Sequence, residues 1–281
     1  MKLQTVKELS LMANSMRSDV VRMLAHAASG HTAGPLGMAD IFSVLFFREM
    51  KYRAAEPKWE GRDRFVLSNG HICPILYSAM ARAGFFPLEE LSTLRKLGSR
   101  LQGHPSMAKL PGIESSSGPL GEGLAIACGM ALSGKMDNAR WRVYCATSDG
   151  EHQEGSTWEA VMLAAKYKLD NLVAVCDRNY IQIDGGTEDV MPLGDMAEKY
   201  RAFGWHAITV DGHSYAAVMN ALDEARATKG KPTMIIANTV PGKGVLAFEG
   251  NYKWHGVAPK PEEASKALEE LAAEREKLEA E

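Results

Sequence analysis

Two polar residues thirty positions apart, Asp149 and Asn179, could hold a metal ion. Apolar runs over residues 142–146 and 172–176 predict buried strands that end close to these two residues, and a helical pattern over about 156–168 separates the runs. A strand–helix–strand unit of this kind brings both strand ends to one edge of a parallel sheet, where ligands bind. One carboxylate, one amide oxygen and a nearby backbone carbonyl suit a hard cation that also binds phosphate oxygens and water. Asp and Asn are also common turn residues after strands, so the pair alone leaves both interpretations open.

Four of the eight histidines form a second set of residues that could do chemistry. Each lies beside a glycine in a segment whose composition predicts a loop or turn: His31, His71, His104 and His255. Imidazoles titrate near neutral pH, so such residues could hydrogen-bond sugar hydroxyls and carry their protons. A histidine beside glycines is also an ordinary solvated turn residue, and each one taken alone leaves that alternative open.

The segments around the first two histidines differ in what they predict. Glycines at 30, 34 and 37, together with Pro35, predict a tight loop around His31 rather than a helix interior. His71 follows a short predicted strand over 65–67, and a helix begins near Pro74. The N-terminus of a helix favours an anion, so His71 is placed where a phosphate group could bind.

Residues 98–123 predict a long loop around His104, rich in glycine, serine and proline. A loop of this length is uncommon unless it is functional. It leads through Gly118, Pro119 and Leu120 into a helix, and glycine permits close approach of backbone to a ligand because it has no Cβ. That helix is dense in small residues, which suit a tightly packed core helix or, alternatively, close packing against a partner protein.

These motifs resemble those of thiamine diphosphate enzymes, and of transketolases in particular. Asp-Gly followed about thirty residues later by Asn resembles the motif in which a cation clamps the cofactor's diphosphate. The flanking runs DGEHQEG and DRNYIQIDG, with the segments SGH, PLGMAD, SNGH and GHP, narrow the resemblance to transketolases. The SNGH segment counts against the related deoxyxylulose-phosphate synthases. The resemblance extends from Leu9 to about Pro259 and covers only the diphosphate-binding domain, the first of a transketolase's three.

The resemblance implies bound thiamine diphosphate with Mg²⁺ or Ca²⁺. The implied metal ligands are the Asp149 and Asn179 side chains and the Ile181 carbonyl. The implied cofactor-binding residues are His71, Gly118, Pro119, Leu120, Asp149, Gly150, Glu154, Asn179 and His255. The cofactor would supply the nucleophilic carbon and the electron sink for moving a two-carbon ketol unit from a ketose to an aldose.

The resemblance also implies residues with a direct part in the reaction: His31, His71, His104, His255, Glu154 and Glu159. His104 would hydrogen-bond the donor's hydroxyls, and His71 and His255 would lie nearer the cofactor. Glu154 would lie close to the cation, and Glu159 would join a chain of carboxylates to a partner subunit. A carboxylate near the start of a helix is also stabilised by the helix dipole, which is the plainer interpretation of Glu154.

The sequence departs from the family pattern at three places. Arg178 stands where the residue before the asparagine is often Asp or Asn. Ser148 replaces the first glycine of Gly-Asp-Gly, which should alter only the turn. Thr32-Ala33-Gly34 replaces Pro-Gly-Gly or Pro-Gly-Ala after His31, which leaves the path of that loop open.

Composition limits the class of protein. A formal charge of −3 and the lack of a basic tract argue against a nucleic-acid surface. No apolar run has the length of a signal peptide core or of a membrane span, so no membrane partner is expected. The four cysteines are scattered singly without zinc-like spacing, which favours a reducing cytoplasm.

Five or six predicted strands alternate with helices, the pattern of an α/β fold with a doubly wound, mostly parallel sheet and helices on both faces. The resemblance implies the thiamine diphosphate-binding fold for it. We expect one domain over residues 1–281, ending in a charged, mostly solvated helical tail at about 261–281.

The leading interpretation is the N-terminal subunit of a split transketolase that acts on sugars, with phosphorylated sugars expected. Its expected partner is a separate C-terminal subunit with the pyrimidine-binding domain, because in the family a glutamate of that domain activates the cofactor. A heterotetramer is the expected assembly. The alternatives are a related ketol or acyl transferase, such as a deoxyxylulose-phosphate synthase-like enzyme, and a non-catalytic assembly or regulatory homologue. The sequence does not identify the sugar.

Overall fold

The computed structural model describes residues 2–280, so Met1 and Glu281 of the expected domain lie outside the described residues. Its centre is a five-stranded sheet in the order β1-β2-β3-β7-β6, in which every neighbouring pair is parallel. The strands are β1 (Arg64–Leu67), β2 (Val143–Ser148), β3 (Leu172–Arg178), β6 (His206–Asp211) and β7 (Thr233–Asn238). Each coincides with an apolar run of the sequence, which confirms the predicted α/β fold.

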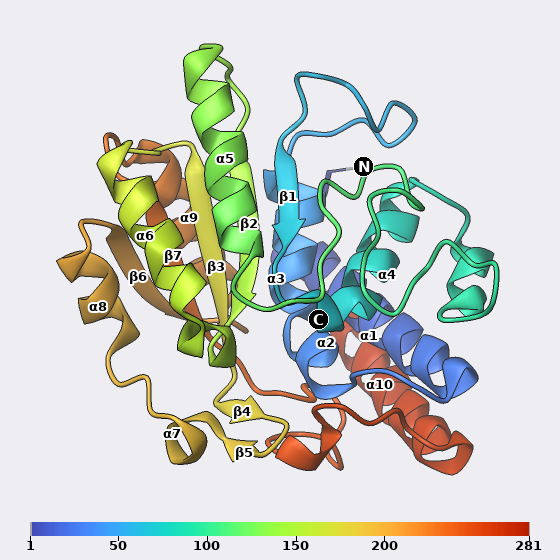
Figure 1. Ribbon diagram of the computed structural model, residues 1–281. Helices are drawn as coiled ribbons and strands as arrows, with labels where there is room; N and C mark the ends of the chain where they lie inside the picture. The colour runs from blue at the N-terminus through green and yellow to red at the C-terminus, as the bar shows by residue number, and fades with distance from the viewer. Residues whose placement is uncertain (1, 281) are drawn as a thin grey trace.

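Helices cover both faces of this sheet (Figure 1). One face packs against α5 (Gly123–Met136), α6 (Gly155–Lys166) and α8 (Met196–Ala202). The other packs against α1 (Val6–Ala27), α3 (Ala39–Val44), α4 (Cys73–Ala83) and α9 (Tyr215–Ala227). Successive strand residues point to opposite faces of the sheet. Tyr144 therefore belongs to the hydrophobic core on the α1, α3, α4 and α9 face, and its neighbour Cys145 belongs to the core on the α5, α6 and α8 face. Because both faces are covered, β2 and β3 are buried along their whole length.

The prediction of a loop without helix after His31 is wrong. Ala33–Gly37 forms the short helix α2, which contains Gly34, Pro35 and Gly37. Proline is tolerated in the first turn of a helix because its missing N–H has no intrahelical partner there. Gly37 lies close to the backbone of Val240, since a Cβ on Gly37 would be 3.0 Å from the Val240 carbonyl oxygen. His31 itself precedes α2 in irregular backbone, as the sequence predicts.

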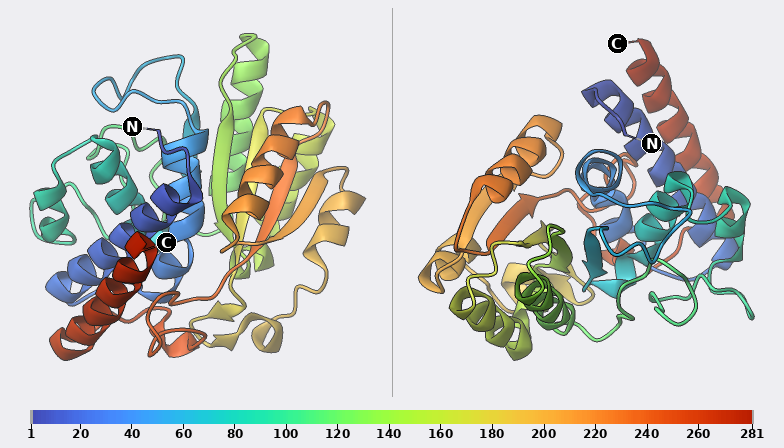
Figure 2. Two further views of the ribbon diagram at one scale, coloured as in Figure 1. Left: turned by 180° about the vertical axis from the view of Figure 1, so that it is seen from behind. Right: turned by 90° about the horizontal axis from the view of Figure 1, so that it is seen from above.

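The C-terminal helix α10 (Pro261–Ala280) is mostly exposed, as expected, but one stripe of it packs on α1. Ala264, Ala267 and Leu271 are buried there, and the Asn14 side chain donates a hydrogen bond to the Leu271 carbonyl at 2.9 Å. Figure 2 shows α10 in red alongside α1 in dark blue. No helix within residues 2–280 is long and apolar enough to cross a membrane.

Shorter elements complete the chain, and several of them lie at the carboxyl ends of the strands. In Figure 1 the strands point downward, towards α2 and the two-stranded hairpin of β4 and β5. The short elements are the π-helix η1 (Leu45–Glu49), the 3₁₀ helices η2 (Gly70–Ile72), η3 (Leu88–Thr93), η4 (Gly150–Gln153) and η5 (Tyr252–Trp254), the strands β4 (Ile181–Gln182) and β5 (Gly185–Gly186), and α7 (Thr187–Val190). This edge of the sheet carries η2, η4, β4 and β5, which follow the ends of β1, β2 and β3, and binding residues are expected there.

Candidate active site

The four histidines singled out in the sequence come together in one cluster. The ring of His31 lies 5.0 Å from that of His71, 5.6 Å from that of His255 and 6.4 Å from that of His104, measured between centroids. The rings of His71 and His255 are 5.2 Å apart. The four residues come from four segments separated by at least thirty residues along the chain, so only the fold brings them together.

Burial keeps these imidazoles neutral. Desolvation lowers the pKa of His31 to about 4, helped by the neighbouring rings and by the Arg95 guanidinium. The same cause lowers the pKa of His71 well below its usual value, and it also lowers the pKa of His104 and of His255. A neutral imidazole has one donor and one acceptor nitrogen, so the cluster can hydrogen-bond hydroxyl groups from either side.

Several buried polar atoms beside the cluster have no hydrogen-bond partner within the described part of the chain. They include Nδ1 of His31 and of His255, both polar atoms of the Asn69 amide, and Oγ of Ser117. The Asn69 residue is fully buried. An unpaired buried polar group costs about 1–3 kcal/mol, so these atoms are arranged for a polar ligand. Asn69 and Ser117 are not among the predicted site residues, although both belong to the motifs that draw attention to their neighbours.

The loop over residues 98–123 closes over η2 through glycines. A Cβ on Gly70 would lie 2.5 Å from Ser117 Oγ, so only glycine fits at this position without a shift of the loop. Gly118 follows directly, and a Cβ there would be 3.9 Å from the His104 ring. Pro119 and Leu120 are exposed at the end of the loop, with Leu120 37% accessible. Of the predicted cofactor-binding residues of this loop, Gly118 therefore lies beside the His104 ring of the cluster.

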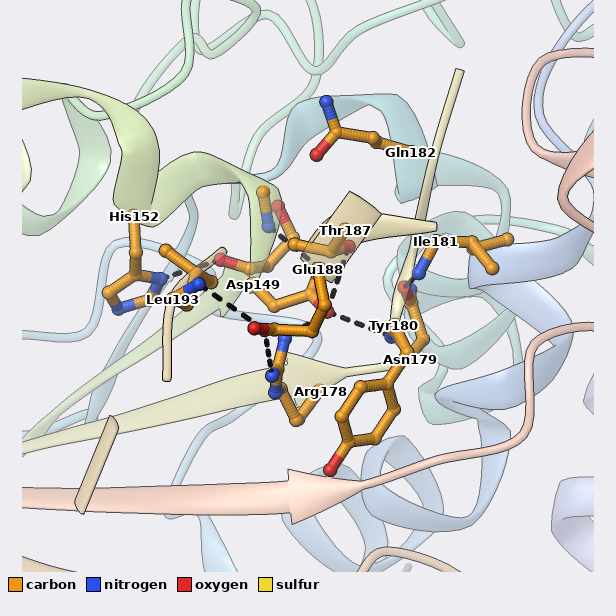
Figure 3. A network of polar contacts seen from close by, with 12 residues as sticks. Asp149, His152, Arg178, Asn179, Tyr180, Ile181, Gln182, Thr187, Glu188 and Leu193 are labelled. Atoms are coloured by element: carbon orange, nitrogen blue, oxygen red, sulfur yellow. Dashed lines mark hydrogen bonds and ion pairs between the residues drawn. The ribbon is translucent and has the colours of Figure 1, made fainter. Parts of the chain in front are cut away.

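Asp149 and Asn179 lie at neighbouring strand ends, as the sequence predicts (Figure 3). The parallel register pairs Ser148 with Asp177, which brings Asp149 level with the end of β3. Asp149 is 1% exposed and accepts hydrogen bonds from the Gly150 N–H at 2.7 Å and the Tyr180 N–H at 2.8 Å. The Thr187 hydroxyl, at 3.3 Å, is a further donor to the same carboxylate. Its position is thus set by backbone and side-chain donors on several segments.

The turn after β3 is held from both sides. Asn179 donates from its amide to Asp177 at 2.8 Å and accepts from the Ile181 N–H at 3.0 Å. Tyr180 between them has a positive φ of 61°, a conformation that non-glycine residues seldom adopt and that is enriched at functional sites. The Tyr180 hydroxyl donates to Asn238 at the end of β7, 2.9 Å away.

Two opposing influences act on the carboxylates at this edge. Burial raises the pKa of Asp149, and the Tyr180 N–H and the Arg178 guanidinium oppose that rise. Burial also raises the pKa of Asp177 to about 7, against the hydrogen bonds from Thr239 and Asn179. A divalent cation beside these groups would favour their ionised forms.

The residues present fit the implied cation and diphosphate. A carboxylate and an amide oxygen converge at one turn, and the unpaired donors and acceptors of the histidine cluster lie at the same edge of the sheet. Residues 2–280 contain no group of three or more His, Cys, Asp or Glu side chains suited to a metal. A cation would therefore depend on the single Asp149 carboxylate, on amide and carbonyl oxygens, and on phosphate oxygens, as Mg²⁺ commonly does.

The glutamates of the Asp149 segment differ in burial. Glu151 is the buried one: it accepts from the Gly121 N–H at 2.7 Å and the Ser148 N–H at 3.1 Å, and it bonds the Ser68 hydroxyl. Glu154 precedes α6 and Glu159 lies on it, and both are exposed. Sequence reasoning misses Glu151 because two of its three partners, Ser68 and Gly121, lie on distant segments.

The chain is similar to known transketolases in sequence and in fold. The family described as "Transketolase, thiamine diphosphate binding domain" matches residues 9–279. The chain is 40% identical to the 6-deoxy-6-sulfo-D-fructose transketolase subunit SqwG of Clostridium sp. (strain MSTE9), covering 95% of this chain and 97% of that protein. It is also 40% identical to one subunit of the apulose-4-phosphate transketolase of Phocaeicola vulgatus, covering 98% of each.

Other relatives are longer than this chain. The transketolase of Rattus norvegicus is 44% identical over 96% of this chain, but the match spans only 42% of that protein. Among solved structures, the transketolase of Campylobacter jejuni superposes with a TM-score of 0.90 at 34% identity, over 98% of this chain and 46% of that one. The relatives that match along their whole length are subunits of split transketolases, and the chain belongs to the transketolase thiamine diphosphate-binding family.

Proposed function

We propose that this chain is the cofactor-binding subunit of a split transketolase that uses thiamine diphosphate with Mg²⁺ or Ca²⁺. The observation that carries the proposal is the convergence of His31, His71, His104 and His255 beside buried polar atoms that have no partner in the described chain. When bound, the thiazolium of the cofactor supplies the nucleophilic carbon and the electron sink for transfer of a two-carbon ketol unit.

Different residues at the carboxyl edge of the sheet would bind the cation and the cofactor. Asp149, Asn179 and the Ile181 carbonyl would hold the cation, and Gly150 and Glu154 lie on the same segment as Asp149. His71, His255 and the 118–120 backbone would contact the cofactor. The Asp149 carboxylate is fixed by several donors already in this structure, so ligand binding there needs little reorganisation.

The histidines would act on the sugar. His104 and His31 are neutral because burial lowers their pKa values, so each can accept a proton from one hydroxyl oxygen and donate to another. The proposed substrates are sugars with an anionic end group, because the two relatives of matching length carry sulfo-fructose and apulose-4-phosphate in their names.

A separate partner subunit with the pyrimidine-binding domain is part of the proposal. α5 and α6 pack side by side and present large apolar side chains to solvent: Ile126, Met136, Met162, Leu163 and Tyr167. An exposed apolar patch of this kind is typical of an interaction surface. Glu159 is exposed on the same helix α6, where a partner carboxylate could reach it. We propose a heterotetramer in the cytoplasm, with residues 1–281 as one domain.

The test is to express the chain with candidate partner subunits and to supply ketose–aldose pairs with phosphate or sulfonate end groups. Products that are two carbons longer than the aldose, formed only with thiamine diphosphate and Mg²⁺, would support the proposal. Condensation of pyruvate with loss of CO₂ would instead indicate a deoxyxylulose-phosphate synthase-like enzyme. An assembled complex that fails to bind thiamine diphosphate would point to a non-catalytic homologue.

A further inference from the structure

Arg178 places a fixed positive charge against an expected cation ligand. It is the last residue of β3 and is only 5% exposed. One guanidinium nitrogen lies 3.1 Å from Asp149 Oδ2, and the other forms an ion pair with Glu188 (Figure 3). The guanidinium carbon is also 4.0 Å from the centre of the Tyr180 ring. The side chain is therefore held on three sides.

We propose that Arg178 is a built-in counter-charge for Asp149, so that the site binds a divalent cation tightly only together with a diphosphate anion. The inference rests on the proposed function for the identity of that anion. Arg178 keeps its charge at every relevant pH, so its effect on the site does not depend on protonation.

The charges around the site support this role. Asp149 supplies the one carboxylate among the three expected protein ligands, and Arg178 cancels its charge. The neighbouring Asp177 carboxylate is engaged by the Asn179 amide and the Thr239 hydroxyl, so its oxygens are turned to those groups. Glu188 lies on the far side of Arg178 with its side chain 40% exposed, where solvent screens it. A cation arriving alone thus meets an almost neutral set of ligands.

A diphosphate changes that balance. Its negative charges attract the cation and are themselves attracted by Arg178, so the anion and the cation each favour binding of the other. The guanidinium lies within a few ångströms of the cation's expected place, where repulsion between like charges is poorly screened. Removing this charge should strengthen binding of a cation alone and weaken its dependence on the anion.

A purely structural brace is the competing explanation, because Arg178 also supports the Tyr180 turn. The two explanations predict opposite results for a neutral replacement. If Arg178 only braces the turn, Arg178→Gln loosens the ligands and weakens cation binding. If Arg178 is a counter-charge, the same change strengthens it.

The experiment measures binding of Mn²⁺, as a spectroscopic substitute for Mg²⁺, to the full chain without cofactor by electron paramagnetic resonance. Arg178→Gln should bind Mn²⁺ about tenfold more tightly than wild type, from the loss of one nearby like charge. Arg178→Lys keeps the charge and should remain near wild type. The double variant Asp149→Asn with Arg178→Gln should lose the gain in Mn²⁺ affinity, which would show that the added affinity arises at the Asp149 site. A folded Arg178→Gln protein with equal or weaker Mn²⁺ affinity would overturn the proposal.

A second variant covers the case in which Arg178→Gln does not fold. Glu188→Gln removes the outer partner of Arg178 and leaves the guanidinium against Asp149. This variant should therefore bind Mn²⁺ alone several-fold more weakly than wild type. Equal or tighter Mn²⁺ binding would contradict the inference. Thiamine diphosphate affinity at low and high Mn²⁺ then tests the coupling, which should be smaller in Arg178→Gln. If no protein of the series binds thiamine diphosphate even when it is assembled with a partner subunit, the proposed function fails, while the order of Mn²⁺ affinities of the chain alone still tests Arg178.

Discussion

At the scale of single residues, the sheet edge combines two environments of different electrostatic character. The histidine cluster is neutral, since burial lowers the pKa of each of its rings. The Asp149 end is ionic, because a buried carboxylate there is paired with a buried guanidinium. A neutral set of donors and acceptors suits sugar hydroxyls, and an ionic set suits a diphosphate with its cation. The two environments therefore match the two proposed ligands, the sugar and the diphosphate of the cofactor.

His104 should act on the donor sugar more than on the cofactor. It lies at the side of the cluster farthest from His31, with 6.4 Å between ring centroids. We expect His104→Ala to lower kcat/KM for the ketose donor by about a hundredfold, as loss of a proton-transfer group does. Thiamine diphosphate affinity, measured by calorimetry in the assembled enzyme, should stay within about threefold of wild type. Equal losses of both would contradict this division of roles.

Asp149 should be required for cation-dependent binding of the cofactor. Its carboxylate is the charged ligand of the proposed cation and also accepts from Gly150 and Tyr180. Asp149→Ala should reduce Mg²⁺-dependent thiamine diphosphate affinity by more than about a hundredfold. Asp223→Ala is the matched control, because it removes an exposed carboxylate near the C-terminal end of α9, which leads to the amino ends of the strands. Retention of wild-type cofactor affinity by Asp149→Ala would remove it from the ligand set.

The buried histidines make the fold sensitive to mild acid. In the folded protein the pKa of His31 is lowered from 6.5 to about 4, so between these values the unfolded chain binds more protons. Stability must therefore fall as the pH drops through this window, and it is fully present above it. Urea unfolding at a series of pH values should show this slope, and His31→Gln should flatten it. Above the window both proteins are neutral at this position, so their difference there gives the cost of the substitution itself.

At the scale of elements, periodicity and turn chemistry locate most of the structure from sequence. The predicted strands over 142–146 and 172–176 overlap β2 and β3, and the helix predicted over about 156–168 overlaps α6, because the pattern of a buried strand or an amphipathic helix is contained in the local sequence. The helix α2 escapes prediction, since local rules disfavour glycine and proline in helices, and the close approach of Gly37 to the Val240 carbonyl is a contact between distant segments.

The motif residues of the candidate site can be predicted from the sequence, but the contacts between them and distant segments cannot. The histidines and Asp149 belong to short motifs that can be recognised along the chain. Glu151, Asn69 and Ser117 acquire their roles from contacts between distant segments, such as the hydrogen bond from Gly121 to Glu151. Arg178 stands out in the sequence as a departure from the family pattern, but its ion pair with Asp149 depends on the register of β2 and β3.

Gly70 should be needed for the loop over residues 98–123 to close on η2. A Cβ at this position would approach Ser117 Oγ to 2.5 Å and the Ser117 carbonyl carbon to 3.1 Å, so alanine must push the loop away. We expect Gly70→Ala to lose about 1–3 kcal/mol of stability and to weaken thiamine diphosphate binding. Gly129→Ala on α5 is the control, because nothing lies within 4 Å of its added Cβ. That variant should gain up to about 1 kcal/mol of stability from helix propensity, and a similar gain in Gly70→Ala would show that the loop does not need the glycine.

At the scale of the whole molecule, the layers of the fold separate the two proposed functional regions. The histidines and the Asp149 turn lie at the carboxyl edge of the sheet, whereas exposed apolar side chains lie on α5 and α6. Figure 1 shows α5 and α6 in green and yellow-green on one face of the sheet. Gly121 and Gly123 join the two regions, because the loop that carries His104 runs directly into α5. A partner docked on α5 and α6 would therefore adjoin the segment beside the cofactor.

The purified chain should be inactive without a partner. The relatives of matching length are subunits, and the full-length transketolase of Rattus norvegicus has more than half of its length outside the matched region. The proposed pyrimidine-binding domain would supply the glutamate that activates the cofactor and would cover its rings from water. Assays of ketol transfer with saturating thiamine diphosphate and Mg²⁺ should show turnover only after a second chain is added.

A substitution on the exposed face of α5 and α6 should weaken binding of the partner subunit. Met162 is 52% exposed on α6, so Met162→Lys should leave the fold intact while putting an unpaired charge into the interface. We expect this variant to bind the partner at least about tenfold more weakly and to regain activity at high partner concentration. Leu88→Lys is the control, because Leu88 is 42% exposed on η3, away from α5 and α6. Full turnover by the isolated wild-type chain would refute the split-enzyme proposal, and unaltered assembly of Met162→Lys would exclude this face as the docking surface.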